Sequence, residues 1–323
     1  MEFFKYKHSF DFMKRANMAI AISMILSIIA YVLIGTKGLN YGIDFEGGTI
    51  VQVQYKQEAP IKKMREVLAS NHLYDGAVIS KFGSDDEVII RMKTSSTNVG
   101  KDIGDVTREM LKPTGDFEIR RVDMVGSAVG SELRTKGITA LLLAVLGILV
   151  YVAFRFEWRF AVASIISLVH DISIAIGFII FFNVEVNLDV LAALLTLLGY
   201  SLNDTIIIFD RIREGIEGSN ENSFKEVIND SITRTLSRTV LTSLMTFLVV
   251  FTLYMFGGEI IHPFSYTMLI GVVIGTYSSI FVAAPMLMWF GFDVAKYRTK
   301  LADAKKRDIE KDKMRSQFEG GVV

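Results

Sequence analysis

Long apolar runs alternate with polar segments along the chain, and they predict a protein that crosses a membrane six times. A helix of about 20 apolar residues spans the roughly 30 Å hydrocarbon layer of a bilayer, and shorter or longer helices adapt by thinning or tilting. The apolar runs cover residues 18–34, 138–154, 160–182, 190–209, 240–256 and 264–290. No small-residue cleavage pattern follows the first run, so we interpret it as a retained span rather than a signal peptide.

The distribution of lysine and arginine predicts the orientation, because cytoplasmic loops carry an excess of both residues. Basic residues occur before the first run, after the second, between the fourth and fifth, and in the tail over residues 296–315. Segments 183–189 and 257–263 contain neither lysine nor arginine. We therefore expect cytoplasmic termini and a location outside the cytoplasm for the long segment after the first run.

Between residues 37 and 136 the pattern becomes that of a soluble domain. Residues 49–55 alternate with the period of a strand, and strands are also predicted over 77–82, 87–93 and 117–125, with a turn at 83–86. Helices are predicted over 60–73 and 99–111, and His72 is expected at a solvent-facing helix end. This strand–helix–strand–strand–helix–strand order is typical of a ferredoxin-like α+β domain.

These elements predict a membrane α-helical fold of six transmembrane helices, with the ferredoxin-like domain between helices 1 and 2. The predicted segments are a cytoplasmic tail (1–17), helix 1 (18–35), the outer domain with its linker (36–136), helices 2–6 (137–291) and a basic cytoplasmic tail (292–323).

Composition narrows the classes of function. The net charge is zero, with 35 basic and 35 acidic residues, so nothing favours a nucleic-acid partner. The chain has no cysteine, which excludes disulfides, thiolate metal sites and thiol nucleophiles. A P-loop is also absent, so ATP is not the direct source of energy. We expect no cofactor and no catalytic activity.

Ionisable side chains inside the predicted spans are costly in hydrocarbon and are therefore functional candidates. Asp204 lies near the cytoplasmic end of the fourth run and Arg238 lies at the start of the fifth. Because the two helices run in opposite directions, we expect these side chains at similar depth and close enough to pair. The polar residues that favour a hydrated path around them are Ser201, Asn203, Thr205, Thr239 and Thr242.

Two interpretations of this pair stay open. In the first, Asp204 and Arg238 form a static ion pair that fixes helix packing. In the second, Asp204 takes up and releases a proton while Arg238 moves toward it and away from it, since a nearby guanidinium favours the ionised carboxylate and burial disfavours it.

Two further spans carry unusual residues. His170 and Asp171 lie near the middle of the third run, and because adjacent residues point to different helix faces, the two need not form one site. Gly271 and Gly275 in the sixth run are four residues apart, a spacing that allows close helix approach.

Several motifs give the chain a resemblance to the SecD/SecF protein-export family, and within it to SecF-type subunits. The longest are GYSLNDT at 199–205 and FDRIRE at 209–214. Supporting motifs are DFEGGT at 44–49, VGSAVGSEL at 125–133, TLSRT at 235–239 and GTYSSI at 275–280.

The resemblance implies half of an RND-type transporter, which joins SecD in the bacterial inner membrane with its outer domain in the periplasm. It implies SecYEG as a further partner, with YajC and YidC as additional candidates and translocating preproteins as substrates. It also implies that the proton-motive force completes export after the SecA-driven phase. By motif, the family's proton-relay residues fall on Asp204, Arg238 and Thr242. Moving one charge through 100 mV is worth about 2.3 kcal/mol, enough to bias a diffusing polypeptide.

Three rival functions remain. Ser201 beside His170 of a neighbouring span suggests an intramembrane serine protease, although Leu202 follows Ser201 where a strained nucleophile turn would need glycine. An RND-type half-transporter for small molecules or lipids would share the six spans. A structural subunit that stabilises SecD without conducting protons would have the same six spans, outer domain and motifs, but no proton relay.

Overall fold

Six of the helical stretches in the described part of the chain are long and apolar enough to cross a membrane, which confirms the predicted number of spans. The structure is a computed structural model that describes residues 9–92, 103–218, 223–292 and 294–319. The six stretches are Phe12–Thr36, Ser127–Arg155, Trp158–Phe181, Leu188–Gly218, Phe224–Phe256 and Gly258–Trp289.

The first stretch joins the 3₁₀ turn η1 (Phe12–Arg15) to α1 (Ala16–Thr36). Helices α5 (Ser127–Arg155), α6 (Trp158–Phe181), α7 (Leu188–Gly218) and α8 (Phe224–Phe256) follow the α+β domain. The last stretch comprises α9 (Gly258–Ser278), the π-helical turn η4 (Ser279–Ala283) and α10 (Ala284–Trp289). Pro285 explains the irregular turn, because proline has no N–H to donate to a preceding carbonyl.

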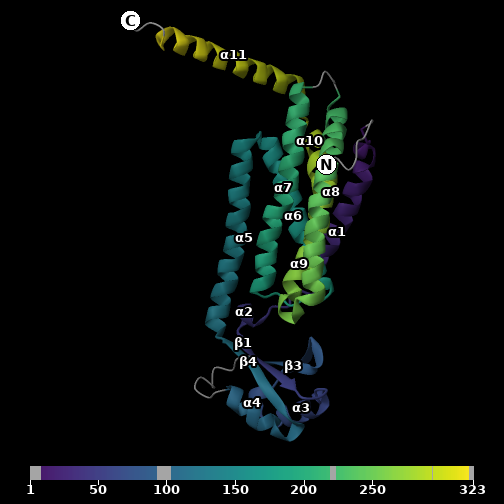
Figure 1. Cartoon of the computed structure of the whole chain (residues 1–323), viewed down its shortest axis with the longest axis vertical. Coiled ribbons are helices and arrows are strands. Elements are labelled where there is room, and N and C mark those ends of the chain that lie inside the picture. Colours follow the sequence, from purple (N-terminus) through teal and green to yellow (C-terminus); the bar gives the residue numbers. More distant parts are fainter. Residues whose placement is uncertain (1–8, 93–102, 219–222, 293, 320–323) are drawn as a thin grey trace.

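The α+β domain lies at one end of the helical bundle, and α11 (Val294–Glu319) projects from the opposite end (Figure 1). Its sheet contains β1 (Gly48–Tyr55), β2 (Val78–Phe82), β3 (Ser84–Met92) and β4 (Phe117–Val125) in the order β2-β3-β1-β4. All three neighbouring pairs are antiparallel. This arrangement confirms the predicted ferredoxin-like order.

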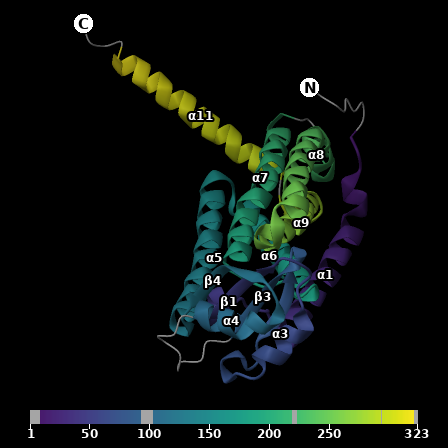
Figure 2. The ribbon, with the colours of Figure 1, turned by 60° about the horizontal axis from the view of Figure 1, so that its bottom comes forward.

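Helices α3 (Ile61–Leu68) and α4 (Ile103–Leu111) cover the face of the sheet that is turned away from the bundle (Figures 1 and 2). Alternate residues of the strands face these helices and form a separate apolar core with Met64, Leu68 and Leu111, each at most 2% exposed. The other face of the sheet is directed toward the ends of the membrane helices.

Three predicted boundaries in this domain were wrong or fall outside the description. The helix expected over 60–73 ends at Leu68, because Asn71 adopts extended backbone angles and its side chain accepts from the N–H of Leu73, which starts the 3₁₀ turn η2 (His72–Tyr74). The turn expected over 83–86 shrinks to Gly83, since Phe82 already pairs with Ser84. Positions 93 and 99–102 of the predicted elements lie outside the described residues. His72 is fully exposed, as predicted.

A short linker attaches the domain to the bundle at two places. The linker helix α2 (Ile43–Glu46) packs against α5. Tyr41 forms a parallel β-bridge with Val186 of the α6–α7 loop, and Val186 exchanges backbone hydrogen bonds with Asn40 and Gly42 at 2.8 and 2.9 Å. The domain is therefore tied to the same loop that joins the two helices with buried carboxylates.

Candidate functional site

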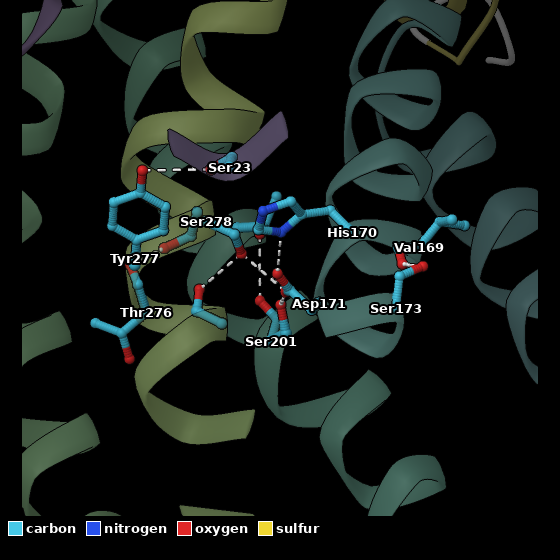
Figure 3. Close-up of polar contacts among 12 residues, drawn as sticks. Ser23, Val169, His170, Asp171, Ser173, Ser201, Thr276, Tyr277 and Ser278 are labelled. Carbon is cyan, nitrogen blue, oxygen red and sulfur yellow. Dashed lines mark hydrogen bonds and ion pairs between the residues drawn. The ribbon is translucent and has the colours of Figure 1, made fainter. Parts of the chain in front are cut away.

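Asp171 is a carboxylate buried at the meeting point of three membrane helices. Its side chain is 1% exposed. Ser201 of α7 and Ser278 of α9 donate hydroxyl hydrogen bonds to Oδ2, at 2.5 and 2.8 Å. Figure 3 shows these two serines converging on Asp171, with His170 beside it. Because donated hydrogen bonds offset the cost of burying a charge, Asp171 holds α6, α7 and α9 together.

His170 and Asp171 form one site, a question that the sequence left open. Nδ1 of His170 lies 2.9 Å from Oδ1 of Asp171. The two side chains leave α6 in different directions, but both are long enough for their tips to meet. The directions of the Cα–Cβ bonds alone do not predict this contact.

Asp204 is the second buried carboxylate of the bundle, at 2% exposure. Its Oδ2 accepts one hydroxyl hydrogen bond, from Ser243 of α8 at 3.3 Å. Thr276 of α9 in turn donates to Ser243 at 2.7 Å. Asp204 therefore lies among hydroxyl groups of two neighbouring helices, and its hydrogen bonding is sparser than that of Asp171.

The expected direct contact between Asp204 and Arg238 is absent among the described side chains. Arg238 and Thr242 are exposed in the isolated chain. The cause is helix rotation: successive residues are about 100° apart, so Arg238 points about 140° away from Ser243, which is the α8 residue that faces Asp204. The Thr242 hydroxyl donates to the backbone carbonyl of Arg238 at 3.0 Å.

The remaining predicted polar residues divide between the interior and the surface. Ser201, Thr205 and Thr239 are buried, at 0, 2 and 1% exposure, whereas Asn203 is exposed because it lies a quarter turn from Asp204. Thr205 donates to the carbonyl of Ser201 at 3.2 Å, while the buried Thr239 hydroxyl has no hydrogen-bond partner among the described residues.

Ser243, Thr276 and Ser278 complete the two carboxylate sites, and none of the three was predicted from the sequence as a site residue. Hydroxyl residues in membrane helices commonly bond their own backbone, so each is ambiguous alone. One usable signal was the spacing: Ser243 is one helical turn after Thr239, and Ser278 follows Gly275 by three residues.

Gly271 and Gly275 bring α9 close to α7, as predicted. A Cβ added to Gly275 would lie 3.0 Å from the Cβ of Ser201, and one added to Gly271 would clash with Leu197. This close approach lets Ser201 and Ser278, on different helices, reach the same carboxylate.

The arrangement does not suit serine-protease chemistry, because the nucleophile would need a base within hydrogen-bond reach. The Ser201 hydroxyl donates to a carboxylate rather than to the imidazole of His170, and its side chain is fully buried. Within the described residues, no cluster of three or more histidine, aspartate or glutamate side chains could hold a metal ion.

Two buried carboxylates in a six-helix bundle, with an α+β domain inserted after the first span, define a polytopic membrane protein of the RND-like class. Residues 106–293 match the family described as "Protein export membrane protein SecD/SecF, C-terminal", and residues 32–59 match the "SecD/SecF GG Motif". The chain belongs to the SecD/SecF family, and within it to the SecF subunits of the protein translocase.

Relatives and solved structures agree with this assignment. The chain is 47% identical to the protein translocase subunit SecF of Helicobacter pylori over 100% of both chains. It is 42% identical to that of Pseudomonas aeruginosa, over 86% of this chain and 90% of the relative. The crystal structure of SecDF from Thermus thermophilus matches with a TM-score of 0.77 and 34% identity, over 88% of this chain and 39% of that one. A super-membrane-facing form of SecDF matches with a TM-score of 0.66.

Proposed function

We propose that this chain works with a SecD-type partner and uses the proton-motive force to complete preprotein translocation after the SecA-driven phase. The observation that carries the proposal is Asp204, a carboxylate inside a membrane helix that is 2% exposed and has one hydroxyl partner. An ionisable group in this position is costly, and its sparse hydrogen bonding leaves it able to exist with or without a proton.

Arg238 is the natural counter-charge for a cycle of proton uptake and release. It lies on the adjacent helix, and no ion pair fixes it to Asp204 among the described residues. A shift of α8, together with a swing of the long Arg238 side chain, would bring the guanidinium toward Asp204 and favour the ionised carboxylate, and the reverse movement would favour proton uptake. Thr242, one turn after Arg238, would move with it.

The exposed face of α8 supports the need for a partner subunit. Arg238, Thr242, Met245 and Val249 follow one another at helical spacing and are all exposed. A guanidinium in a membrane helix seldom faces lipid. The SecDF structures, of which this chain covers 39 and 41%, contain further chain beyond the matched part. We infer that a SecD-type subunit covers this face.

The cellular setting follows from the same proposal. The helical bundle lies in the inner membrane, with both termini in the cytoplasm and the α+β domain in the periplasm. SecYEG, with YajC and YidC, makes up the surrounding machinery. Proton passage at Asp204 shifts the helices that are tied to the α+β domain through the α6–α7 loop. The domain then hinders backward sliding of the emerging chain.

Preprotein export into inverted membrane vesicles, with and without a proton gradient, tests the proposal. Asp204→Asn is expected to lose the gradient-stimulated component of export while the subunit still assembles with its partner. Asp210→Asn is the matched control, because this half-exposed carboxylate lies on the same helix and pairs with Arg155 and Arg213. Retention of gradient-stimulated export by Asp204→Asn would remove the proton role. Loss of partner assembly in this variant would instead support a purely structural subunit.

A further inference from the structure

We propose that His170 and Asp171 form a second proton-binding centre, in which Nε2 of the imidazole takes up the proton and the Asp171 carboxylate balances its charge. The inference deepens the proposed proton-driven function and rests on it. The second centre lies on α6 rather than on α7, and its proton acceptor is an imidazole nitrogen rather than the carboxylate of Asp204.

The first step is the state of Asp171. Its two oxygens receive three contacts from polar neighbours, two of them hydroxyl donors from Ser201 and Ser278 and the third from Nδ1 of His170. With both serines donating, Asp171 acts as an acceptor, which is the role of an ionised carboxylate. Beside an ionised Asp171, Nδ1 of His170 carries the hydrogen of the contact with Oδ1.

The second step is the free atom of His170. With Nδ1 committed to Asp171, the remaining ring atom with hydrogen-bonding capacity is Nε2. The side chain of His170 is 8% exposed, and Nε2 is buried without a hydrogen-bond partner among the described residues. Buried polar atoms without partners are rare in proteins, and each needs an explanation.

The third step is electrostatic. A neutral imidazole beside an ionised Asp171 leaves one uncompensated negative charge in the low-dielectric interior of the bundle. Addition of one proton to Nε2 converts the pair into imidazolium and carboxylate, which is neutral overall. Histidine suits this role because its ordinary pKa is close to neutral pH.

The fourth step is access. His170 lines a cavity of about 520 Å³ between α1, α6 and α10, whose wall also includes Ser23, Ser27 and Tyr31. Apart from these hydroxyls the wall is mostly apolar, and Nε2 itself is buried behind it. In Figure 3 the imidazole extends from α6 toward Ser23 of α1. A small swing of the imidazole would expose Nε2 to this cavity, along a route that does not pass Asp204.

The fifth step is the electrostatic surroundings of the imidazole. In the central parts of the helices packed against α6, the titratable side chains are Tyr31 of α1, Tyr151 of α5, Tyr200 and Asp204 of α7, and Tyr266 and Tyr277 of α9. Turn η4 and helix α10 carry none. Asp204 is the one carboxylate in this set, so it is the group to which the His170–Asp171 charge can be coupled.

Two chains of hydroxyl groups connect the centres. On α7, Ser201 donates to Asp171 and lies one turn before Asp204. On α9, Ser278 donates to Asp171, whereas Thr276 reaches Asp204 through Ser243. A change of charge at one carboxylate therefore alters the hydrogen bonds that hold the same two helices at the other.

The test is nitrogen NMR of the full-length chain with ¹⁵N-labelled histidine in lipid nanodiscs, over a pH range from about 5 to 8. The chain has four histidines, and the His170→Gln variant assigns the signal of interest. We expect His170 to change from neutral with a hydrogen on Nδ1 to doubly protonated as the pH falls. An imidazole that stays neutral over the whole pH range would overturn the proposal. This measurement is made on the parent chain, and the His170→Gln variant serves only to assign the signal.

The Asp171→Asn variant tests the carboxylate's part in this centre. We expect it to lose the doubly protonated form at pH values where the parent chain shows it, and an unchanged titration would contradict this part. Ser167→Ala is the matched control, because Ser167 is buried on the same helix one turn earlier and its hydroxyl contacts none of these groups.

Export assays separate this inference from the proposed function. His170→Gln is expected to reduce gradient-stimulated export severalfold. If Asp204→Asn abolishes that component while His170 remains neutral and His170→Gln exports normally, the second centre fails and the proposed function stands. If Asp204→Asn exports normally with a gradient, the proposed function fails whatever the state of His170.

Discussion

Asp171 and Asp204 are both buried carboxylates, but the protein surrounds them differently. Asp171 has two hydroxyl donors within 2.8 Å and an imidazole at 2.9 Å. In the described part of the chain, Asp204 has a single hydroxyl donor, at 3.3 Å. A well-satisfied carboxylate stabilises the packing of its helices, whereas a sparsely satisfied one changes charge at less cost. This difference is why we propose proton transfer at Asp204 and a supporting role for Ser201 at Asp171.

Ser201→Ala is expected to lower the stability of the bundle, since it leaves buried Asp171 with one donor fewer. Removal of one partner of a buried charged group costs about 1–3 kcal/mol. Thermal unfolding in detergent measures the effect. Thr196→Ala is the control on the same helix, because the exposed Thr196 hydroxyl bonds only the backbone carbonyl of Ala192. Equal midpoints for the two variants would contradict the supporting role.

The residue types and depths of the site were predictable, but its contacts were not. A charged residue at position 204 inside an apolar run stands out in the sequence, and so does the pair at 170–171. The rotation of α8 was not predictable, because the apolar residues around Arg238 do not distinguish a face covered by a partner from one that faces lipid. The Asp204–Arg238 contact therefore remained an expectation that the isolated chain does not fulfil.

At the scale of elements, the junction between the α+β domain and α5 depends on a pair of glycines. Gly47 has a φ of +80°, and a Cβ there would lie 2.7 Å from the Cα of Ser127 at the start of α5. The adjacent Gly48, with φ +147°, would meet the carbonyl oxygen of Met92 at 2.6 Å. Both positions exclude a side chain through backbone conformation and close contact with neighbouring backbone.

Gly47→Ala is expected to destabilise the junction by more than its backbone conformation alone requires. Gly76 provides the matched control: its φ is +74°, yet a Cβ there has open space. A positive φ costs either variant about 1–3 kcal/mol, toward the upper end at Gly47, where ψ is +161°, and the clash with Ser127 adds to the cost for Gly47→Ala alone. Limited proteolysis and thermal unfolding compare the two. A Gly76→Ala variant as unstable as Gly47→Ala would contradict the account.

Element types were predictable from periodicity, while several ends were not. The strand over 117–125 and the start of the strand over 49–55 follow from alternation and turn residues. The helix after Pro60 was predicted too long, since its end depends on the side chain of Asn71 capping the next turn. Local hydrogen bonds of this kind compete with helix continuation and leave no periodic signal.

At the scale of the whole molecule, an ion pair supports the link between the α+β domain and the bundle. Arg91 of β3 pairs with Glu185 of the α6–α7 loop, and Asp44 of α2 accepts from the N–H of Leu188 at 3.0 Å. Burial raises the pKa of Glu185, the Arg91 guanidinium lowers it, and the nearby charge of Asp44 raises it again, with a net upward direction.

This raised pKa predicts how pH affects the junction. The folded chain keeps a proton on Glu185 at pH values where the unfolded chain has lost it. The stability contributed by this group is therefore fully present below its ordinary value of 4.5 and is lost as the pH rises through the raised pKa. Glu185→Gln is expected to flatten the decline of the unfolding midpoint above pH 4.5, with the exposed Glu46→Gln as control. A decline as steep as that of the parent would contradict this.

The exposed face of α8 predicts where the partner subunit lies. Because the chain has no cysteine, single cysteines can be introduced into it directly. Met245→Cys on α8 is expected to crosslink to a SecD-type subunit in membranes. Leu142→Cys on α5 is the control, since the two native side chains are 65 and 64% exposed. Crosslinking through Leu142→Cys but not through Met245→Cys would place the partner on the wrong side for this account.

The claim that Asp204 gains and loses a proton is tested most directly by infrared difference spectroscopy of the full-length chain in lipid vesicles. The C=O stretch of a protonated carboxyl group absorbs at a frequency that is separate from the bands of the ionised carboxylate. We expect such a band to appear as the pH is lowered and to be missing from the spectra of Asp204→Asn. Identical difference spectra for the parent chain and this variant would contradict the account.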